Sequence, residues 1–593
     1  MSVFSNILPE IIKGFNEVYG THLSKNDFQI ENTRKGFEGD VTLVVFPLLK
    51  ITKLSPEESA NKLGCWLKEH SAIVADFNVI KGFLNLVLSA DFWLQQFNCW
   101  LSDTNYGTNN HETGKTYMVE YSSPNTNKPL HLGHLRNNFL GFSVSEILKA
   151  NGHAVIKTQI INDRGIHICK SMLAWQKFGN GETPDKSGLK GDHLIGKYYV
   201  LFDKVYKEQI AELIESGLDR EEAEKTAPIL KEAQQMLMKW EEKDPEIYEL
   251  WKKMNQWVYT GFDETYKRMG VDFDKLYYES DTFILGKDIV ANGLKVGVFY
   301  EKEDHSVWVD LSNEKMDDKL LLRADGTSVY MTQDIGTAIE RYKDFPEISG
   351  MIYTVGNEQN HHFKVLFTIL NKIGYEWSEE CYHLSYGMVE LPEGKMKSRE
   401  GTVVDADDLM DSIVLDAKEM TKERGHLEGM SDQEKENLYE IIGNGALKYY
   451  LLKVDPKKKM MFDPAESIDL NGNTGPFIQY GYARIQSILR RESPGDFKVN
   501  ILVKINDHEL SLLKELADFP KIIAEAGKLL SPSVVANYIY GLVKAYNSFY
   551  QSVPILGEED QEVKKFRILL TYKVGQVIKD GMFLLGIDVP NRM

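Results

Sequence analysis

Two histidines at one expected helix start carry the clearest chemical signal in the sequence. His131 and His134 flank Gly133 and lie three residues apart, so in a helix they share one face. A helix N-terminus presents free N–H groups and a partial positive charge, and both attract anions. Imidazoles at this place would supply hydrogen-bond donors for phosphoryl or adenylyl transfer without a buried permanent charge. On its own, the pattern fits two ordinary surface histidines equally well.

A short basic segment is the second signal. Residues 394–401 read Gly-Lys-Met-Lys-Ser-Arg-Glu-Gly and lie between an expected strand and an expected helix. Such a loop could bind a triphosphate, and it could equally be a solvated run of charges. Taken alone, the composition favours the solvated run.

The elements around these residues predict a parallel sheet. Residues 116–123 and 154–161 have the pattern of strands, and residues 130–150 between them have that of an amphipathic helix. Strand, helix and strand in this order form a βαβ unit, whose strands run parallel. Residues 170–275 interrupt the alternation with long helical stretches rich in Glu and Lys. From residue 438 onward almost every segment has helical periodicity.

Composition excludes several classes of protein. The net charge of −19 argues against a chain coated in basic residues for non-specific nucleic-acid binding. The part after Asn471 differs, because it holds 15 basic against 13 acidic residues, and a polyanion site is expected there. Four scattered cysteines cannot form a disulfide framework or a Cys-x-x-Cys metal site. No apolar run is long enough to span a bilayer, and the first twenty residues show no signal-peptide pattern. We therefore expect a soluble cytoplasmic protein.

Together the two signals resemble the His-Ile-Gly-His and Lys-Met-Ser-Lys-Ser motifs of class I aminoacyl-tRNA synthetases. Order, separation and the strand-helix context match. Further segments are similar to the arginyl-tRNA synthetase family over nearly the whole chain. These segments are residues 119–136, 322–334, 355–363, 475–488 and 584–593.

The resemblance implies an α/β fold with three domains. A small α+β N-terminal domain that contacts tRNA would span residues 1–112. A Rossmann-like parallel-sheet catalytic domain would span residues 113–465, with the helical insertion at about 170–275. An all-α anticodon-binding domain would span residues 466–593. Class I synthetases bind ATP at the carboxyl ends of the strands, between the two halves of the sheet.

By resemblance, the catalytic residues are His131, His134, Lys395 and Lys128. The ATP-binding residues implied by the family are Pro124, His131, Gly133, His134, Lys395, Met396 and Ser398. The sequence departs from the general class I loop, which has Ser and Lys where this chain has Lys397 and Ser398. In the family a lysine just before the first motif is thought to replace the lost one, and Lys128 stands there. The role of Lys397 stays open.

Arginine carries a planar guanidinium with five donors, which carboxylates and a phenol match well. The resemblance implies an arginine-binding set of Ser123, Asn125, His134, Tyr330, Asp334, Gln359 and Glu279. Tyr330 and Asp334, four residues apart, would share a face if a helix begins there. Without the family, a helix cap for Asp334 and a core aromatic for Tyr330 would be the simpler interpretations.

In the C-terminal part, Gln479, Tyr480 and Arg484 resemble the family's tRNA-binding residues. The implied reaction is ATP-dependent activation of L-arginine and its transfer to tRNA(Arg), with activation itself requiring tRNA. Magnesium would enter with ATP, and we expect no metal site built by the protein, no membrane contact and a monomer.

Three alternatives remain at this point. Another class I synthetase, such as a glutamyl or cysteinyl enzyme, would share the motifs, although a cysteinyl pocket needs a zinc site that these cysteines do not offer. A tRNA-binding paralogue without activity would explain the altered loop at Lys397 and Ser398. A nucleotidyltransferase that does not use tRNA would leave the helical C-terminal part unexplained.

Overall fold

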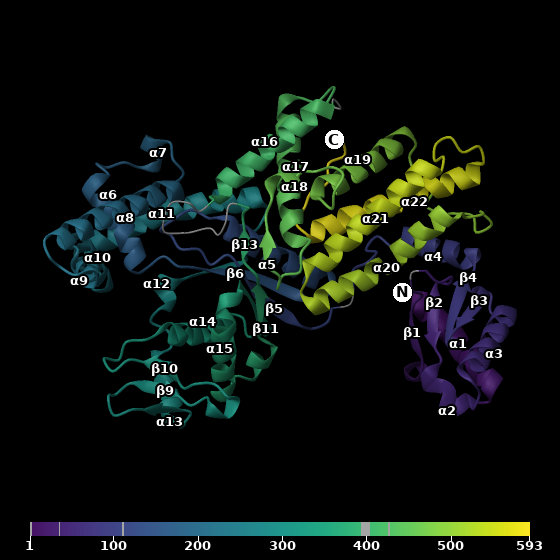
Figure 1. The fold of residues 1–593 in the computed structure, drawn as a ribbon, viewed down its shortest axis with the longest axis horizontal. Coiled ribbons are helices and arrows are strands. Elements are labelled where there is room, and N and C mark those ends of the chain that lie inside the picture. The colour runs from purple at the N-terminus through teal and green to yellow at the C-terminus, as the bar shows by residue number, and fades with distance from the viewer. Residues whose placement is uncertain (1–2, 35, 110–111, 393–403, 425–426) are drawn as a thin grey trace.

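The computed structural model of the 593-residue chain describes residues 3–34, 36–109, 112–392, 404–424 and 427–593. A parallel sheet lies at the centre of the molecule (Figure 1). Within the described residues its strand order is β12-β11-β5-β6-β7. The strands are β5 (Thr116–Glu120), β6 (Ala154–Ile161), β7 (Lys275–Tyr278), β11 (Ile348–Gly356) and β12 (Tyr382–Tyr386).

The βαβ unit predicted from the sequence is present. Helix α5 (Leu132–Ala150) connects β5 to β6, and the two strands pair in parallel with Met118 opposite Ile156. On its other side β5 pairs with β11, which arrives more than 200 residues later. The strand order therefore changes direction between β5 and β11, and ligands bind open parallel sheets at such a point. This arrangement confirms the predicted fold class.

The connection from β6 to β7 is entirely helical. It consists of α6 (Ile166–Phe178), α7 (Pro184–Ser187), α8 (Gly191–Glu215), α9 (Arg220–Thr226), α10 (Pro228–Glu241) and α11 (Pro245–Met269). These helices occupy one end of the long axis of the molecule (Figure 1). They pack through an apolar stripe that includes Leu194, Phe202, Trp251 and Phe262, all buried.

The connection from β7 to β11 holds a second, smaller module. An antiparallel sheet of order β10-β9-β8 is followed by a helix that leads back to the central sheet. The elements are α12 (Glu279–Thr282), α13 (Lys287–Lys295), β8 (Phe299–Glu301), β9 (Val307–Val309), β10 (Lys319–Leu322) and α14 (Tyr330–Asp344). The sequence did not predict this sheet, because strands of three or four residues give too short a pattern.

After β11 the chain adds β12 to the central sheet and continues into helices and a short pair of strands. The elements are α15 (Asn360–Lys372), β13 (Val389–Glu390), α16 (Ala406–Arg424), α17 (Asp432–Leu452), β14 (Met460–Met461) and α18 (Pro464–Ser467). Strand β13 pairs with β14 in parallel. Residues 393–403 between β13 and α16 lie outside the described residues, and they include Lys395, Met396, Lys397 and Ser398.

The two ends of the chain form the remaining modules. The N-terminal one combines helices with a sheet of order β1-β2-β4-β3. Its elements are α1 (Val3–Tyr19), β1 (Gln29–Asn32), β2 (Val41–Val44), α2 (Leu49–Thr52), α3 (Pro56–His70), β3 (Val74–Ile80), β4 (Phe83–Leu88) and α4 (Ala90–Ser102). The C-terminal helices are α19 (Gly475–Arg491), α20 (Asp507–Leu529), α21 (Pro532–Ser552) and α22 (Gln561–Leu584).

The N-terminal and C-terminal modules touch each other directly. Asn98 exchanges two hydrogen bonds with the backbone of Val499, and the Tyr106 hydroxyl donates to the Leu516 carbonyl oxygen at 2.8 Å. One apolar core runs from Ile7 through α5 to Ile587. No helix among the described residues is long and apolar enough to cross a membrane.

Candidate active site

The first turn of α5 is built around its two histidines. His131 is the N-cap residue, and its Nδ1 accepts the backbone N–H of Gly133 at 3.2 Å. His134 Nδ1 in turn accepts the backbone N–H of His131 at 3.1 Å, which completes a reciprocal cap. The two rings are 3.9 Å apart between centroids. A Cβ atom at position 133 would lie 3.0 Å from the His131 ring, so a side chain there would crowd the capping histidine.

Both rings are neutral donors in this environment. Burial and the nearby Lys128 ammonium lower the pKa of His131 to about 4. Burial, His131 and Lys128 hold the pKa of His134 well below its usual value. Since each Nδ1 accepts a backbone hydrogen bond, each neutral ring carries its proton on Nε2. The helix N-terminus therefore offers two Nε2–H donors without a fixed charge.

The loop from β5 to α5 carries the other residues predicted on this side. Ser122 and Ser123 both have positive φ angles, of 79° and 48°, which β5 and α5 impose on the turn. The Asn137 side chain accepts the Ser122 backbone N–H at 2.5 Å and fixes the turn. Asn125 is exposed and bridges to Asn162 at the end of β6, while Pro124 before it is buried. Burial lowers the pKa of Lys128 in the same loop.

Carboxylates gather at the carboxyl ends of β6 and β7. Glu279, at the start of α12, is largely buried, and its pKa is raised to about 7. Burial is the main cause; Arg164 opposes it, and the charges of Asp163 and Asp334 add to it. The Arg164 guanidinium approaches Glu279 at 3.9 Å and Glu241 at 2.9 Å. Two carboxylates thus share one guanidinium while the charges of Asp163 and Asp334 lie nearby, which favours a further cation in this place.

Asp163 and Arg164 were missed by the sequence interpretation. Asp163 is held by the Tyr259 hydroxyl at 2.8 Å and by the backbone and side chain of Ser280. It therefore anchors Ser280, the residue after Glu279. A sequence signal did exist, because two charged residues directly follow a strand of a parallel sheet at its ligand-binding edge.

Tyr330 and Asp334 share the first turn of α14. The helix begins at Tyr330, as their spacing required, and the Tyr330 side chain is 77% exposed. Asp334 faces His362 of α15, whose Nε2 lies 2.6 Å from the Asp334 carboxylate. Gln359 is exposed in the turn before α15. Asp334 and Glu279 are thus brought together, whereas Tyr330 and Gln359 stand open to solvent. The sequence interpretation had not given His362 a role of its own.

The basic segment that carries Lys395 lies outside the described residues, but the described chain that resumes at residue 404 lies beside the histidines. Asp405 forms an antiparallel bridge with His131. The Leu132 N–H donates to the Val404 carbonyl at 3.3 Å, and the Ala406 N–H donates to the Leu130 carbonyl at 2.9 Å. The order of motifs along the chain thus brings position 404 to the first turn of α5.

A second candidate site lies on the C-terminal helices. The Arg484 guanidinium lies over the rings of Tyr480 and Tyr550, at 5.0 and 4.9 Å from their centroids, and donates to Asn547 at 2.6 Å. A cavity of about 430 Å³ opens beside them. Its lining includes Tyr480, Arg484, Arg490, Arg491, Tyr550 and Arg592. Stacked aromatics among arginines suit single-stranded nucleic acid.

Gln479 does not lie on this surface. Its side chain is fully buried, and its amide donates to the carbonyl oxygens of Ile441 and Asp588 at 2.9 and 2.8 Å. Gln479 therefore holds α17 and the C-terminal segment together. The sequence could not distinguish it from Tyr480, because neighbouring helical positions point about 100° apart.

A parallel sheet that changes direction beside a His-x-Gly-His helix cap, followed by an all-helical module, defines a class I aminoacyl-tRNA synthetase. Family models agree: residues 96–463 match the catalytic domain of class I (R) tRNA synthetases and residues 478–593 the DALR anticodon-binding domain. The chain belongs to the arginyl-tRNA synthetase family. This membership decides against the glutamyl and cysteinyl alternatives.

Relatives and solved structures agree with this assignment. The chain is 57% identical to an arginine–tRNA ligase of Flavobacterium psychrophilum and 55% identical to one of Bacteroides thetaiotaomicron, each over the full length of both chains. Its fold is similar to that of Thermus thermophilus arginyl-tRNA synthetase, with a TM-score of 0.77, 22% identity and full coverage of both chains. The Plasmodium falciparum enzyme gives a TM-score of 0.76 at 18% identity, covering 100% of this chain and 99% of that one.

Proposed function

We propose that this chain is an arginine–tRNA ligase. It activates L-arginine with ATP to arginyl-adenylate, and it transfers the arginine to the 3′-terminal ribose of tRNA(Arg). The observation that carries the proposal is the pairing of two opposite environments at one sheet edge. Neutral histidine donors lie at the start of α5, and the carboxylates of Asp163 and Asp334 lie near Glu279. The histidine donors suit a triphosphate, and the carboxylates suit a guanidinium.

In the first step, the arginine α-carboxylate attacks the α-phosphorus of ATP, and pyrophosphate leaves. ATP enters as its magnesium complex, which neutralises part of the triphosphate charge. His131 and His134 donate from Nε2 to phosphate oxygens as charge develops on them, and Gly133 leaves the backbone open to the nucleotide. Lys128 and Lys395 hold the leaving pyrophosphate, and Pro124, Met396 and Ser398 complete the nucleotide site. None of these groups forms a covalent intermediate, so catalysis rests on positioning and charge.

Arginine specificity rests on the carboxylates. Glu279 and Asp334 bind the guanidinium, and Tyr330 closes over it from the first turn of α14. Ser123, Asn125, His134 and Gln359 hold the α-amino and α-carboxylate groups. A lysine side chain would leave the planar arrangement of acceptors incompletely filled, because an ammonium lacks the fork of five donors.

Transfer requires tRNA to reach both ends of the molecule. We propose that anticodon bases stack on Tyr480 and Tyr550 beside Arg484, and that residues 1–112 contact the body of the tRNA. The corresponding division that we propose is residues 1–112, 113–465 and 466–593. One chain carries all these groups, so a monomer suffices, and the cytoplasm supplies ATP and tRNA.

Charging assays test this function. The purified chain is incubated with ATP, magnesium and tRNA, and each amino acid is offered in turn. We expect charging with arginine alone. Charging with another amino acid would contradict the assignment, and tRNA binding without any charging would favour the inactive paralogue. Adenylate formation that is indifferent to tRNA and to arginine would point to a different nucleotidyltransferase.

A further inference from the structure

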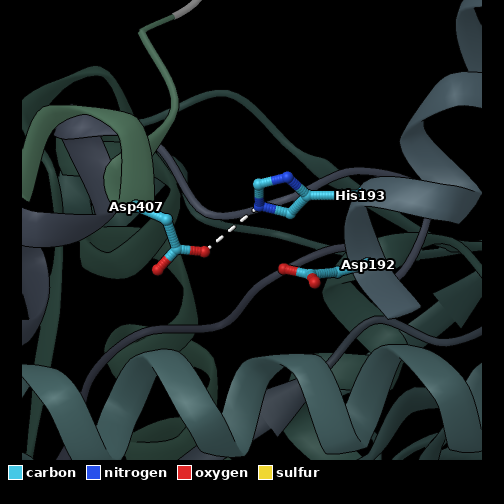
Figure 2. Close-up of side chains that lie close together, drawn as sticks. All are labelled: Asp192, His193 and Asp407. Atoms are coloured by element: carbon cyan, nitrogen blue, oxygen red, sulfur yellow. Dashed lines mark hydrogen bonds and ion pairs between the residues drawn. The ribbon is translucent and has the colours of Figure 1, made fainter. Parts of the chain in front are cut away.

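The start of α8, in the helical insertion, reaches across to the chain that follows the basic segment. The Lys190 ammonium, just before α8, pairs with Asp407 and lies 3.3 Å from Asp192. His193 Nε2 lies 3.1 Å from Asp407 (Figure 2). It also lies 3.4 Å from Asp405. We call Lys190, Asp192, His193, Asp405 and Asp407 the Lys190 cluster.

The Lys190 cluster has the composition of a metal site, but its cation is already present. Ligand atoms of Asp192, His193 and Asp407 lie within 4.8 Å of one another. Lys190 Nζ, however, pairs with both carboxylates and also donates to the Thr265 hydroxyl at 2.5 Å. Asp192 is fully buried, so its carboxylate depends on this ammonium. The cluster is therefore an ion-pair network that joins two segments of chain.

One of these segments leads directly to the helix cap of α5. Asp405 bridges to His131, and the backbone on either side of it pairs with Leu130 and Leu132. A shift of Asp405 and Asp407 would therefore pull on the residue that caps α5.

Helix α8 meets the Lys128 loop at a second point. A Cβ atom on Gly196 would lie 2.8 Å from Pro129 Cδ and 3.8 Å from the Cα of Lys128. Gly196 therefore allows the helix to pack against this loop, and the loop rests on its backbone. The Lys190 cluster and the Gly196 contact both involve the start of α8. They reach the two sides of the proposed phosphate site.

We propose that the first two turns of α8 position the phosphate-binding residues of the synthetase. Lys190 and His193 fix Asp405 and Asp407, and through them the His131 cap, while Gly196 fixes the loop that carries Lys128. Lys190 and His193 act as positioning residues and do not touch substrate. The inference rests on the proposed function, which supplies the reaction that is positioned.

Steady-state kinetics give the first test. Arginine-dependent exchange of pyrophosphate into ATP is measured with saturating tRNA(Arg) for Lys190→Met, Asp407→Asn and the double variant. We expect each single variant to lower kcat by roughly 10- to 100-fold, the scale of a small misplacement of catalytic groups. The KM for arginine should change less than about twofold, because Glu279 and Asp334 lie on other elements. The double variant should be no worse than the poorer single one, and Lys190→Arg should restore most of the rate.

Lys197→Met is the matched control. Lys197 lies on the same helix and pairs with Glu182 at 2.8 Å, away from Asp405. This variant should behave as the wild type. An equal loss of kcat in Lys197→Met, or a kcat per folded molecule of Lys190→Met equal to that of the wild type, would overturn the inference.

Hydrogen exchange gives a test that does not depend on activity. In Lys190→Met the backbone amides of Leu132 and Ala406 should exchange faster than in the wild type, whereas those of β11 should not. Unchanged exchange at both amides, or equal acceleration in β11, would refute the positioning role. A wild-type chain without arginine-dependent exchange of pyrophosphate would refute the proposed function instead, and the amides of Leu132 and Ala406 would still report on the cluster.

Discussion

His131 and His134 show how a protein can place donors at a phosphate site and keep them uncharged. Burial and the Lys128 ammonium lower both pKa values, and the reciprocal cap assigns the proton to Nε2 in each ring. Protonated rings would bind ATP itself more tightly, and this gain would not lower the barrier. Neutral donors strengthen as charge develops on the phosphate oxygens.

Loss of either ring should therefore be severe. His131→Ala or His134→Ala should lower the rate of adenylate formation by about 100-fold or more, the usual effect of removing one donor to a transition state. Arginine-dependent pyrophosphate exchange in the presence of tRNA measures this rate. For His131→Ala, which is not placed against arginine, the KM for arginine serves as the internal control and should stay within a few-fold. Near-normal turnover by either variant would remove the histidines from the mechanism.

The two lysines proposed for pyrophosphate should be equally important. If Lys128 replaces the lysine that the loop lacks, Lys128→Ala should reduce kcat/KM for ATP as strongly as Lys395→Ala, whereas Lys397→Ala should be milder. The same exchange assay, with ATP as the varied substrate, compares the three variants. A severe defect in Lys397→Ala together with a silent Lys128→Ala would reverse the roles.

Glu279 predicts a pH dependence for arginine binding. Its pKa of about 7 in the free protein means that it is protonated in part at neutral pH, and a bound guanidinium would favour the charged form. The KM for arginine should therefore rise as pH falls below 7, by up to about tenfold per unit. Kinetics at pH 6 to 8 measure this change. Glu279→Gln should flatten the profile, and an equally steep profile in that variant would exclude Glu279.

Much of the candidate site could be predicted from residue types, and some of it could not. The spacing of His131 and His134 was sufficient, because the helix imposes their contact. Asp334 and Glu279 are 55 positions apart, so only the fold brings them together. Arg164 and Asp163 follow a predicted strand, which is a signal in the sequence, but their partners Glu241, Glu279 and Ser280 are known only from the fold. The orientation of Gln479 depends on helix packing, which residue type does not specify.

Helix α5 is the element that connects the proposed active site to the rest of the molecule. Near its start, buried Arg136 donates to the carbonyl oxygens of Gly387, Pro456 and Lys458, so it holds together the chain just before β13 and the chain just before β14. Near its middle, the Ser143 hydroxyl donates to the Leu584 carbonyl at the end of α22. A displacement of α22 would thus be transmitted to the helix that carries both histidines.

Lys448 of α17 contacts the chain that follows α22, and this contact predicts a change of stability with pH. Its ammonium is buried, donates to the Gly586 carbonyl after α22, and has its pKa lowered to about 8 by burial. Between pH 8 and 10 the unfolded chain binds more protons at this residue than the folded one, so the free energy of unfolding should rise with pH. The gain at this one site is about 1–3 kcal/mol.

Thermal unfolding at pH 8, 9 and 10 measures this effect. The wild type should gain stability relative to Lys448→Met across this range, because methionine has no proton to lose. Lys453→Met is a useful comparison, since Lys453 lies on the same stretch of chain and is less buried. If the melting temperatures of the wild type and of Lys448→Met changed in parallel with pH, folding would not lower the pKa of this lysine.

At the level of elements, periodicity predicted the long helices and strands better than the short strands. Strand β5 begins and helix α5 ends where the sequence placed them, and β6 has both ends as expected. The apolar residues 41–49 predict one strand, but the strand ends at Val44, and Phe46–Leu48 form a short 3-10 helix. Strands β8, β9 and β10 were missed, since each is too short to show alternation.

For the whole molecule, tRNA should act as an activator as well as a substrate. Arginine-dependent pyrophosphate exchange should be near zero without tRNA, and charging should weaken as salt rises. Arg484→Ala should raise the KM for tRNA by about tenfold or more, the scale of losing a stacked base. Lys565→Ala, which alters a surface pair with Asp496 in the same module, is the control. Full exchange without tRNA would contradict the activation while leaving the ligase assignment intact.

Point variants are preferable to a truncation in this test. Removing everything after Asn471 would expose the faces of α5 and α17 that pack on α19, α21 and α22, since these helices share one core. Loss of activity in such a fragment would report on unfolding. The Arg484 variant keeps that core and removes only the side chain beside Tyr480 and Tyr550.

The contact between Asn98 and Val499 also bears on how the chain is made. These residues are 401 positions apart, yet the N-terminal module packs part of its apolar surface against α20 and α22. At about 5–20 residues per second, a ribosome needs roughly 20–80 seconds to synthesise the intervening chain. During that time Phe97 and Tyr106 lack their final neighbours. The nascent protein must therefore be shielded, or must fold provisionally, until its last helices emerge.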